Sequence, residues 1–289
     1  MFETKPLKQL IGVDFSSSPS RKKPIAVASG LLNHSQLCLQ HIEKLNRFDQ
    51  FENLLKQTTP FLMAIDMPFG LSRQLVDGLN WPGSNNYKLS AWTDLVNFYC
   101  QQDKEFLRAT FKAWCDARPA GQKFAHRVCD KPAGASPSMK WVNPPVAWML
   151  KEGAFRLLAA GVFVPGMHAG DPQRVAVEAY PGYLVKRIIG RQSYKTDSSQ
   201  DSADRKMARS ELLCALEEGM LLGLKMKIPT YLRAQLLLDQ KGDLLDATLC
   251  LLVAAWASMH EDQNYGLPSL IDPVEGWITG VPASASASS

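Results

Sequence analysis

Several signatures that identify enzymes and membrane proteins are missing from this 289-residue sequence. No run of about 18 apolar residues is present, so a membrane-spanning helix is not expected. There is also no Walker A loop, no G-x-S-x-G elbow and no Cys–His signature of a thiol enzyme. These absences argue against a P-loop nucleotide site and against the familiar serine and cysteine nucleophiles.

Cysteine is scarce and scattered along the chain. The six cysteines form no C-x-x-C pair, and no cluster of cysteine and histidine has the spacing of a zinc finger. Scattered cysteines without a signal peptide are typical of a reducing compartment. We therefore expect a cytoplasmic protein.

The composition itself is ordinary for a globular protein. Hydrophobic residues make up 46% of the chain and charged residues 21%. The length allows one large domain or two modest ones, with a core that needs no disulfide. The formal charge, 32 − 28 = +4, is mildly basic and compatible with a polyanionic partner.

What the sequence does contain is carboxylates in apolar surroundings. Asp14 and Asp66 each follow directly on a short, strongly apolar run. Asp246 is the only charge within the most apolar helix candidate, residues 244–257, and Asp243 lies three residues before it. An ionised carboxylate is costly to bury unless it is paired or bound to a metal. Several such placements in one chain predict that the carboxylates converge on a divalent cation.

The order of elements brings two of these residues together. Strands are predicted at 9–15, 24–31, 36–45 and 60–65, and a helix at 48–57. The helix can return the chain so that the fourth strand lies parallel to the first. Asp14 and Asp66 would then share one edge of the sheet, where ligands bind in open α/β folds.

A helix would place Asp243 and Asp246 on one face, close to its positive end. Four carboxylates around one point suit a pair of Mg²⁺ or Mn²⁺ ions, since both ions prefer oxygen ligands. Simpler explanations remain open. Asp14 and Asp66 could be turn residues, and Asp243 could be an N-cap. Asp246 is harder to explain, because Asp is unfavourable inside an apolar helix.

Residues 81–165 interrupt the pattern and read as a mainly helical insertion. The flanking parts, 1–80 and 166–280, would form the core, and the Ala/Ser-rich tail 281–289 is expected to be disordered. Five of the seven tryptophans lie in the insertion: Trp81, Trp92, Trp114, Trp141 and Trp148. They could stack on bases or simply form a helical core.

The stretch 118–141 within the insertion is basic. It contains Arg118, Lys123, Arg127, Lys131 and Lys140, with Asp130 as its one acidic residue. These cations could contact phosphates, or Arg127 could pair with Asp130 to hold the loop. His126 lies in the same stretch, where a substrate contact and a structural role are both open. Glu178 interrupts a predicted strand at 174–179. It could be a site residue, or it could simply face outward from the strand.

Four short motifs together resemble a known family. Residues 12–16, 64–68, 177–181 and 243–247 read GVDFS, AIDMP, VEAYP and DLLDA. In this order and spacing they are similar to domain of unknown function family 429, described as predicted nucleases with a ribonuclease H-like fold. The resemblance spans residues 9 to 258.

The resemblance extends to several single positions. It falls on Arg127 and Asp130, on Tyr194 and Lys195, and on Arg209. Together with the local positive charge, it leads us to expect substrate-binding roles for Arg127, Asp130, Lys195 and Glu178. The carboxylate arrangement is also similar to that of Holliday-junction resolvases, although those carry Glu where this chain has Asp66.

From these observations we expect an α/β fold with a ribonuclease H-like core. The core would have a five-stranded mixed sheet with helices on both faces, plus the helical insertion. The expected activity is metal-dependent phosphodiester hydrolysis, with Asp14, Asp66, Asp243 and Asp246 as catalytic residues. Asp14, Asp66 and Asp246 would be the ligands of Mg²⁺ or Mn²⁺.

The expected partner is nucleic acid or another phosphate-containing substrate. Two alternatives come from other classes. Actin-like ATPases and sugar kinases share the expected core, and residues 14–18 could form a phosphate loop, although such loops are usually rich in glycine. The second alternative is a module that binds nucleic acid without catalysing a reaction. The sequence leaves the oligomeric state open.

Overall fold

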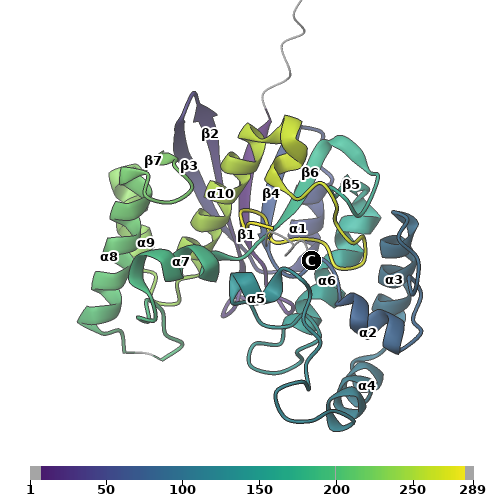
Figure 1. The fold of residues 1–289 in the computed structure, drawn as a ribbon. Helices are drawn as coiled ribbons and strands as arrows, with labels where there is room; N and C mark the ends of the chain where they lie inside the picture. The colour runs from purple at the N-terminus through teal and green to yellow at the C-terminus, as the bar shows by residue number, and fades with distance from the viewer. Residues whose placement is uncertain (1–7, 199, 284–289) are drawn as a thin grey trace, which may run out of the picture.

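A computed structural model describes residues 8–198 and 200–283 of the chain. A seven-stranded mixed sheet lies at the centre of these residues, in the order β5-β6-β4-β1-β2-β3-β7 (Figure 1). The strands are β1 (Gln9–Asp14), β2 (Ile25–Asn33), β3 (Gln36–Leu45), β4 (Phe61–Asp66), β5 (Val162–Phe163), β6 (Asp171–Ala179) and β7 (Lys225–Lys227).

The expected arrangement of the central strands is confirmed. β1, β2 and β3 form an antiparallel meander, while β4 pairs parallel to β1 and β6 pairs parallel to β4. The crossover through helix α1 (Phe48–Leu55) brings β4 beside β1.

The expected number of five strands is wrong. Two short strands extend the sheet: β5 has two residues and pairs with β6, and β7 has three and pairs with β3. Segments this short carry no alternation of apolar and polar residues, so the sequence pattern could not reveal them.

Helices cover both faces of the sheet (Figure 1). One face contributes to a core shared with α1, α2 (Arg73–Gly78), α3 (Ser90–Gln101), α4 (Lys104–Asp116) and α6 (Val146–Ala160). The other packs against α7 (Pro181–Ile189), α8 (Ala203–Glu218), α9 (Thr230–Leu238) and α10 (Asp243–Met259). A single turn, α5 (Asp130–Ala133), and the 3-10 helix η1 (Glu261–Gly266) complete the regular structure of the described residues.

Period-two alternation along the strands decides which side chains meet which helices. In β1, Ile11 and Val13 enter the core with α1 to α6, whereas Leu10 enters the core with α7 to α10. Gly12 lies on the α10 face, where a Cβ atom would stand 2.1 Å from the carbonyl oxygen of Ala247. The missing side chain thus lets the helix backbone rest directly on β1.

The segment expected to be an insertion shares its core with the sheet. Trp81, Trp92, Trp114 and Trp148 are all buried in the cluster that also contains the sheet residues of that face. The Trp92 indole donates a hydrogen bond of 2.7 Å to the carbonyl of Phe69. These four rings are therefore core residues and have no face open for stacking on a base.

The described part of the C-terminal segment is packed in place. Val281 is buried with Ile278 and Cys129 in a small apolar cluster. Most of the tail expected to be disordered, residues 284–289, lies outside the described residues. Within residues 8–198 and 200–283, no helix combines the length and apolarity needed to cross a bilayer.

Candidate functional site

The site begins where β1 and β4 end. Asp14 and Asp66 are the last residues of their strands and are direct partners in the parallel register. Alternation places both on the α10 face, because Leu10 of β1 and Leu62 and Ala64 of β4 face the same core. The strand ends therefore set two carboxylates side by side on one face of the sheet.

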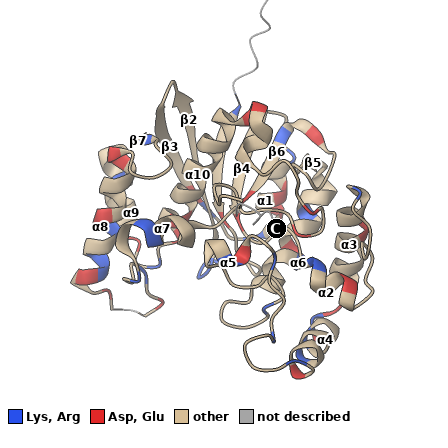
Figure 2. Ribbon diagram, in the orientation of Figure 1, with Lys and Arg blue, Asp and Glu red and all other residues tan. Residues whose placement is uncertain are grey.

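Helix α10 brings two further carboxylates to this edge. The helix lies over β1, β2 and β4, and Figure 2 shows it almost free of charged residues. Its acidic residues, Asp243 and Asp246, are both in the first turn, and Asp246 is only 2% exposed. The N-cap is Gly242, while Asp239 accepts a hydrogen bond from the Leu244 amide. Asp243 is thus not the cap of its own helix.

Tyr194 and Lys195 hold the Asp246 carboxylate in place. The Tyr194 hydroxyl donates to Oδ1 over 2.5 Å, and the Lys195 ammonium donates to Oδ2 over 2.7 Å. Gly242 permits this approach: it adopts a φ of +75°, and a Cβ atom there would lie 3.0 Å from the Cβ of Lys195. Arg209 donates a hydrogen bond to the Tyr194 carbonyl and so holds the backbone of residues 194–195 in place.

The carboxylates disturb one another strongly. Burial is the largest cause that raises the pKa of Asp14 well above its ordinary value, and the charges of Asp246 and Asp66 add to it. Burial and then the charge of Asp246 raise the pKa of Asp66 to about 7, against the opposing charge of Lys195. The pKa of Asp243 is raised as well, first by burial. The cluster holds more negative charge than the Lys195 ammonium balances.

The donor chemistry of this cluster suits a hard divalent cation, since carboxylate oxygens are the usual ligands of Mg²⁺ and Mn²⁺. The side chains as they stand are not a preassembled cage. Among residues 8–198 and 200–283, no three His, Cys, Asp or Glu side chains are arranged to hold a metal ion. Tyr194 and Lys195 occupy both oxygens of Asp246. A bound cation would have to displace the Lys195 ammonium from Asp246.

The other predicted site residues lie on the opposite face of the sheet. Glu178 pairs with Ile65 in the strand register and points to the core that contains α1 to α6. There Arg127 donates to both of its oxygens, over 2.7 and 2.6 Å. Arg127 also donates to Asp130 over 3.0 Å, and the side chains of both are almost fully buried. The pairing of Arg127 with Asp130, one of the two sequence interpretations, is present.

A small cavity of about 80 Å³ adjoins both groups of residues. Asp66 lines it together with Arg127 and Glu178. Tyr180, Met149 and Val146 supply much of its apolar wall. The buried ion pair therefore stands next to the carboxylate edge, although it belongs to the other face.

Comparison with known protein families matches residues 12–269 to one family, Protein of unknown function (DUF429). The chain belongs to the DUF429 family. No curated protein and no solved structure matches it. Membership is thus established over most of the chain, and the family description names no activity.

Two residues of this DUF429 chain with clear roles at the site were not among the predicted site residues. Tyr194 holds Asp246, and the signals available in the sequence were the family resemblance at this position and its place directly before Lys195. Glu275 accepts hydrogen bonds from the backbone amides of Arg73 and Val128. It joins α2 to the 118–131 loop across a sequence separation of 147 residues or more, which no local pattern can reveal.

Proposed function

We propose that this protein is a metal-dependent phosphodiesterase that hydrolyses nucleic acid. Asp14, Asp66 and Asp246 would bind Mg²⁺ or Mn²⁺, and Asp243 would assist. The metal ions would supply a water of lowered pKa and stabilise the leaving oxygen. The ribonuclease H-like character of the core belongs to the same proposal, and the order of β1 to β4 and β6 supports it.

One observation carries the proposal: Asp14 and Asp66 are in register on adjacent parallel strands, with Asp246 in the first turn of the helix packed across them. Burial, and after it the charge of the neighbouring carboxylates, raises the pKa values of Asp14 and Asp66. Perturbed carboxylates of this kind gather at functional sites. An oxygen-binding cation would relieve the repulsion.

The surrounding residues of the chain each have a task in this proposal. Tyr194 fixes the rotamer of Asp246 through its hydrogen bond. Lys195, whose side chain is half exposed, would turn toward an incoming phosphate once a metal ion takes its place at Asp246. On the other face, Arg127 and Glu178 anchor the 118–131 loop close to Asp66.

The test is calorimetric titration with Mn²⁺, followed by a cleavage assay on single-stranded DNA, duplex DNA, RNA and a four-way junction. We expect wild-type protein to bind Mn²⁺ and to cleave at least one substrate. Asp14→Asn should lose both properties and keep the fold. Asp94→Asn, an exposed aspartate on α3, is the matched control and should behave as wild type.

Two outcomes would count against the proposal. If wild-type protein binds no Mn²⁺, the proposed metal site is refuted. Thermal stabilisation by ATP with Mg²⁺, but not by nucleic acid, would move the assignment to the phosphotransferase class.

A further inference from the structure

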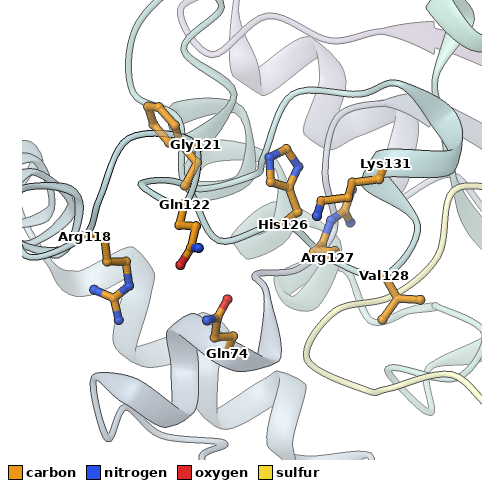
Figure 3. Close-up of a pocket in the computed structure, with 9 residues that line it drawn as sticks. Gln74, Arg118, Gly121, Gln122, His126, Arg127, Val128 and Lys131 are labelled. Atoms are coloured by element: carbon orange, nitrogen blue, oxygen red, sulfur yellow. The ribbon is translucent and has the colours of Figure 1, made fainter.

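A second cavity, of about 380 Å³, lies between α2 and the 118–131 loop (Figure 3). Gln74 of α2 and Gln122 of the loop point their side-chain amides toward one another. Arg118 lies on one side of this pair and His126 and Lys131 on the other. A volume of this size suits a ligand as large as a nucleotide, since small-molecule sites begin near about 300 Å³.

The lining of this cavity is positive. It contains Arg118, Arg127, Lys131 and His126, and within the described part of the chain no carboxylate side chain lines it. Arg127 is already engaged by Glu178 and Asp130, so its charge is not available to a ligand. The available cations are those of Arg118 and Lys131.

These two cations differ in how they are held. Arg118 stacks on the ring of Trp114 and donates to the Trp114 carbonyl, which fixes its guanidinium at the cavity wall. Lys131 is exposed and has no ion pair or hydrogen bond to its side chain among the described residues. A fixed guanidinium and an exposed ammonium without an ion-pair partner in the described chain form a suitable pair for a phosphate group.

His126 supplies an independent observation. Its Nδ1 atom is buried and has no hydrogen-bond partner among the described residues. Buried polar atoms are nearly always satisfied, and one left alone beside a cavity indicates a missing water or ligand atom. Gln74 and Gln122 add donors and acceptors to the same space.

We propose that this cavity binds a nucleotide through its phosphate group, with Lys131 and Arg118 as the cationic contacts. The same chemistry occurs in a free nucleotide and in one unit of a nucleic-acid chain. The small cavity next to Asp66 also has Arg127 in its wall, so the two cavities share this residue. The site requires no cleavage at the carboxylates.

The test is equilibrium binding of a fluorescent eight-nucleotide single strand, measured by anisotropy in EDTA so that no metal-dependent cleavage occurs. We expect Lys131→Glu to weaken binding by roughly tenfold, because one phosphate contact becomes repulsive. Gln122→Ala, which changes no charge, should weaken it by a smaller factor. Lys227→Glu on β7 repeats the charge reversal away from the cavity and should bind as wild type.

Competition separates the two sources of phosphate. Displacement of the strand by a 5′-nucleoside monophosphate identifies a free-nucleotide site, and failure to displace it identifies a site for a unit of the chain. Because EDTA removes divalent cations, strand binding in this assay tests the inference separately from the proposed catalysis. Equal affinity of wild type and Lys131→Glu would overturn it, as would an equal loss in Lys227→Glu or an absence of binding by wild type.

Discussion

At the scale of single residues, Asp66 connects the chemistry of the site to the stability of the fold. Its pKa is raised from an ordinary 3.8 to about 7, so between these values the folded chain holds a proton that the unfolded chain has lost. The free energy of unfolding must then fall as the pH rises through this range. Asp66 therefore destabilises the fold least at low pH, or when a bound cation takes the place of its proton.

Replacing Asp66 with Asn should remove this part of the pH dependence. We expect Asp66→Asn to match wild type near pH 4 and to exceed it near pH 8 by about 1–3 kcal/mol, at about 1.4 kcal/mol per pKa unit and allowing for partial exposure. Urea unfolding in EDTA at several pH values measures the difference. The control Asp94→Asn should show the pH dependence of wild type. If the unfolding free energies of wild type and Asp66→Asn change with pH in the same way, the pKa assigned to Asp66 is wrong.

The ammonium of Lys195 and a bound divalent ion would compete for the same carboxylate. Its ammonium lies 2.7 Å from Asp246 and competes with any divalent ion for that carboxylate. We therefore expect Lys195→Met to bind Mn²⁺ more tightly, by roughly tenfold from the removed repulsion, and to bind an oligonucleotide more weakly. Calorimetry and anisotropy give the two affinities.

The matched control for this prediction is Lys206→Met on α8, an exposed lysine outside the carboxylate cluster. It should leave the Mn²⁺ affinity unchanged. Weaker Mn²⁺ binding by Lys195→Met would instead show that the lysine positions Asp246 for the metal.

At the scale of elements, the approach of α10 to β1 brings Asp246 over the strand ends. The contact depends on Gly12, whose position offers no room for a side chain against the helix backbone. A backbone atom cannot move aside as a flexible side chain does. The absence of a side chain at Gly12 therefore sets the distance between α10 and β1. It also sets the distances from Asp246 to Asp14 and Asp66.

Gly12→Ala should therefore force the helix away from the strand. The new Cβ atom would stand 2.0 Å from the amide nitrogen of Leu251, and overpacking of this kind costs about 1–3 kcal/mol or more. We expect a lower melting temperature together with weaker Mn²⁺ binding, because Asp246 moves with the helix. Ser29→Ala, in the strand position that pairs with Ile11, should change neither property. An unchanged Mn²⁺ affinity in Gly12→Ala would show that the helix position does not govern the site.

At the scale of the whole molecule, the buried network around Arg127 ties the 118–131 loop to the sheet and to the C-terminal segment. Arg127 contacts Glu178 of β6, Asp130 of α5 and the carbonyl of Glu275. Three distant parts of the sequence thus meet at one guanidinium. Burial raises the pKa of Glu178, and the charge of Arg127 counteracts that rise.

Removing this guanidinium should be costly because two buried carboxylates lose their partner. We expect Arg127→Met to lower the free energy of unfolding by about 3–5 kcal/mol. Adding Glu178→Gln in the same chain should recover part of the loss. Arg108→Met, at an exposed arginine of α4, should change stability by less than about 0.5 kcal/mol. Urea unfolding measures all three variants, and an Arg127→Met protein of native stability that has lost oligonucleotide binding would assign the residue to substrate instead.

The sequence contains enough to predict the carboxylate edge but little of what surrounds it. Apolar runs that end in Asp14 and Asp66, with a crossover helix between them, predict adjacent parallel strands by local rules alone. The face on which Glu178 lies depends on the register of β6 against β4, and its contact with Arg127 joins positions 51 residues apart. The hydrogen bond from Tyr194 to Asp246 spans 52 residues, so it also depends on tertiary packing that no local pattern encodes.

The two short outer strands have a consequence for how the molecule behaves in a crowded solution. A long, flat edge strand offers unpaired amides and carbonyls to another chain and promotes aggregation. Here β7 presents three residues, with exposed lysines at 225 and 227 on either side of buried Met226, and β5 presents only two. Repulsion between the lysines and the brevity of both strands should keep molecules from joining edge to edge, even while the sheet interior remains strongly apolar.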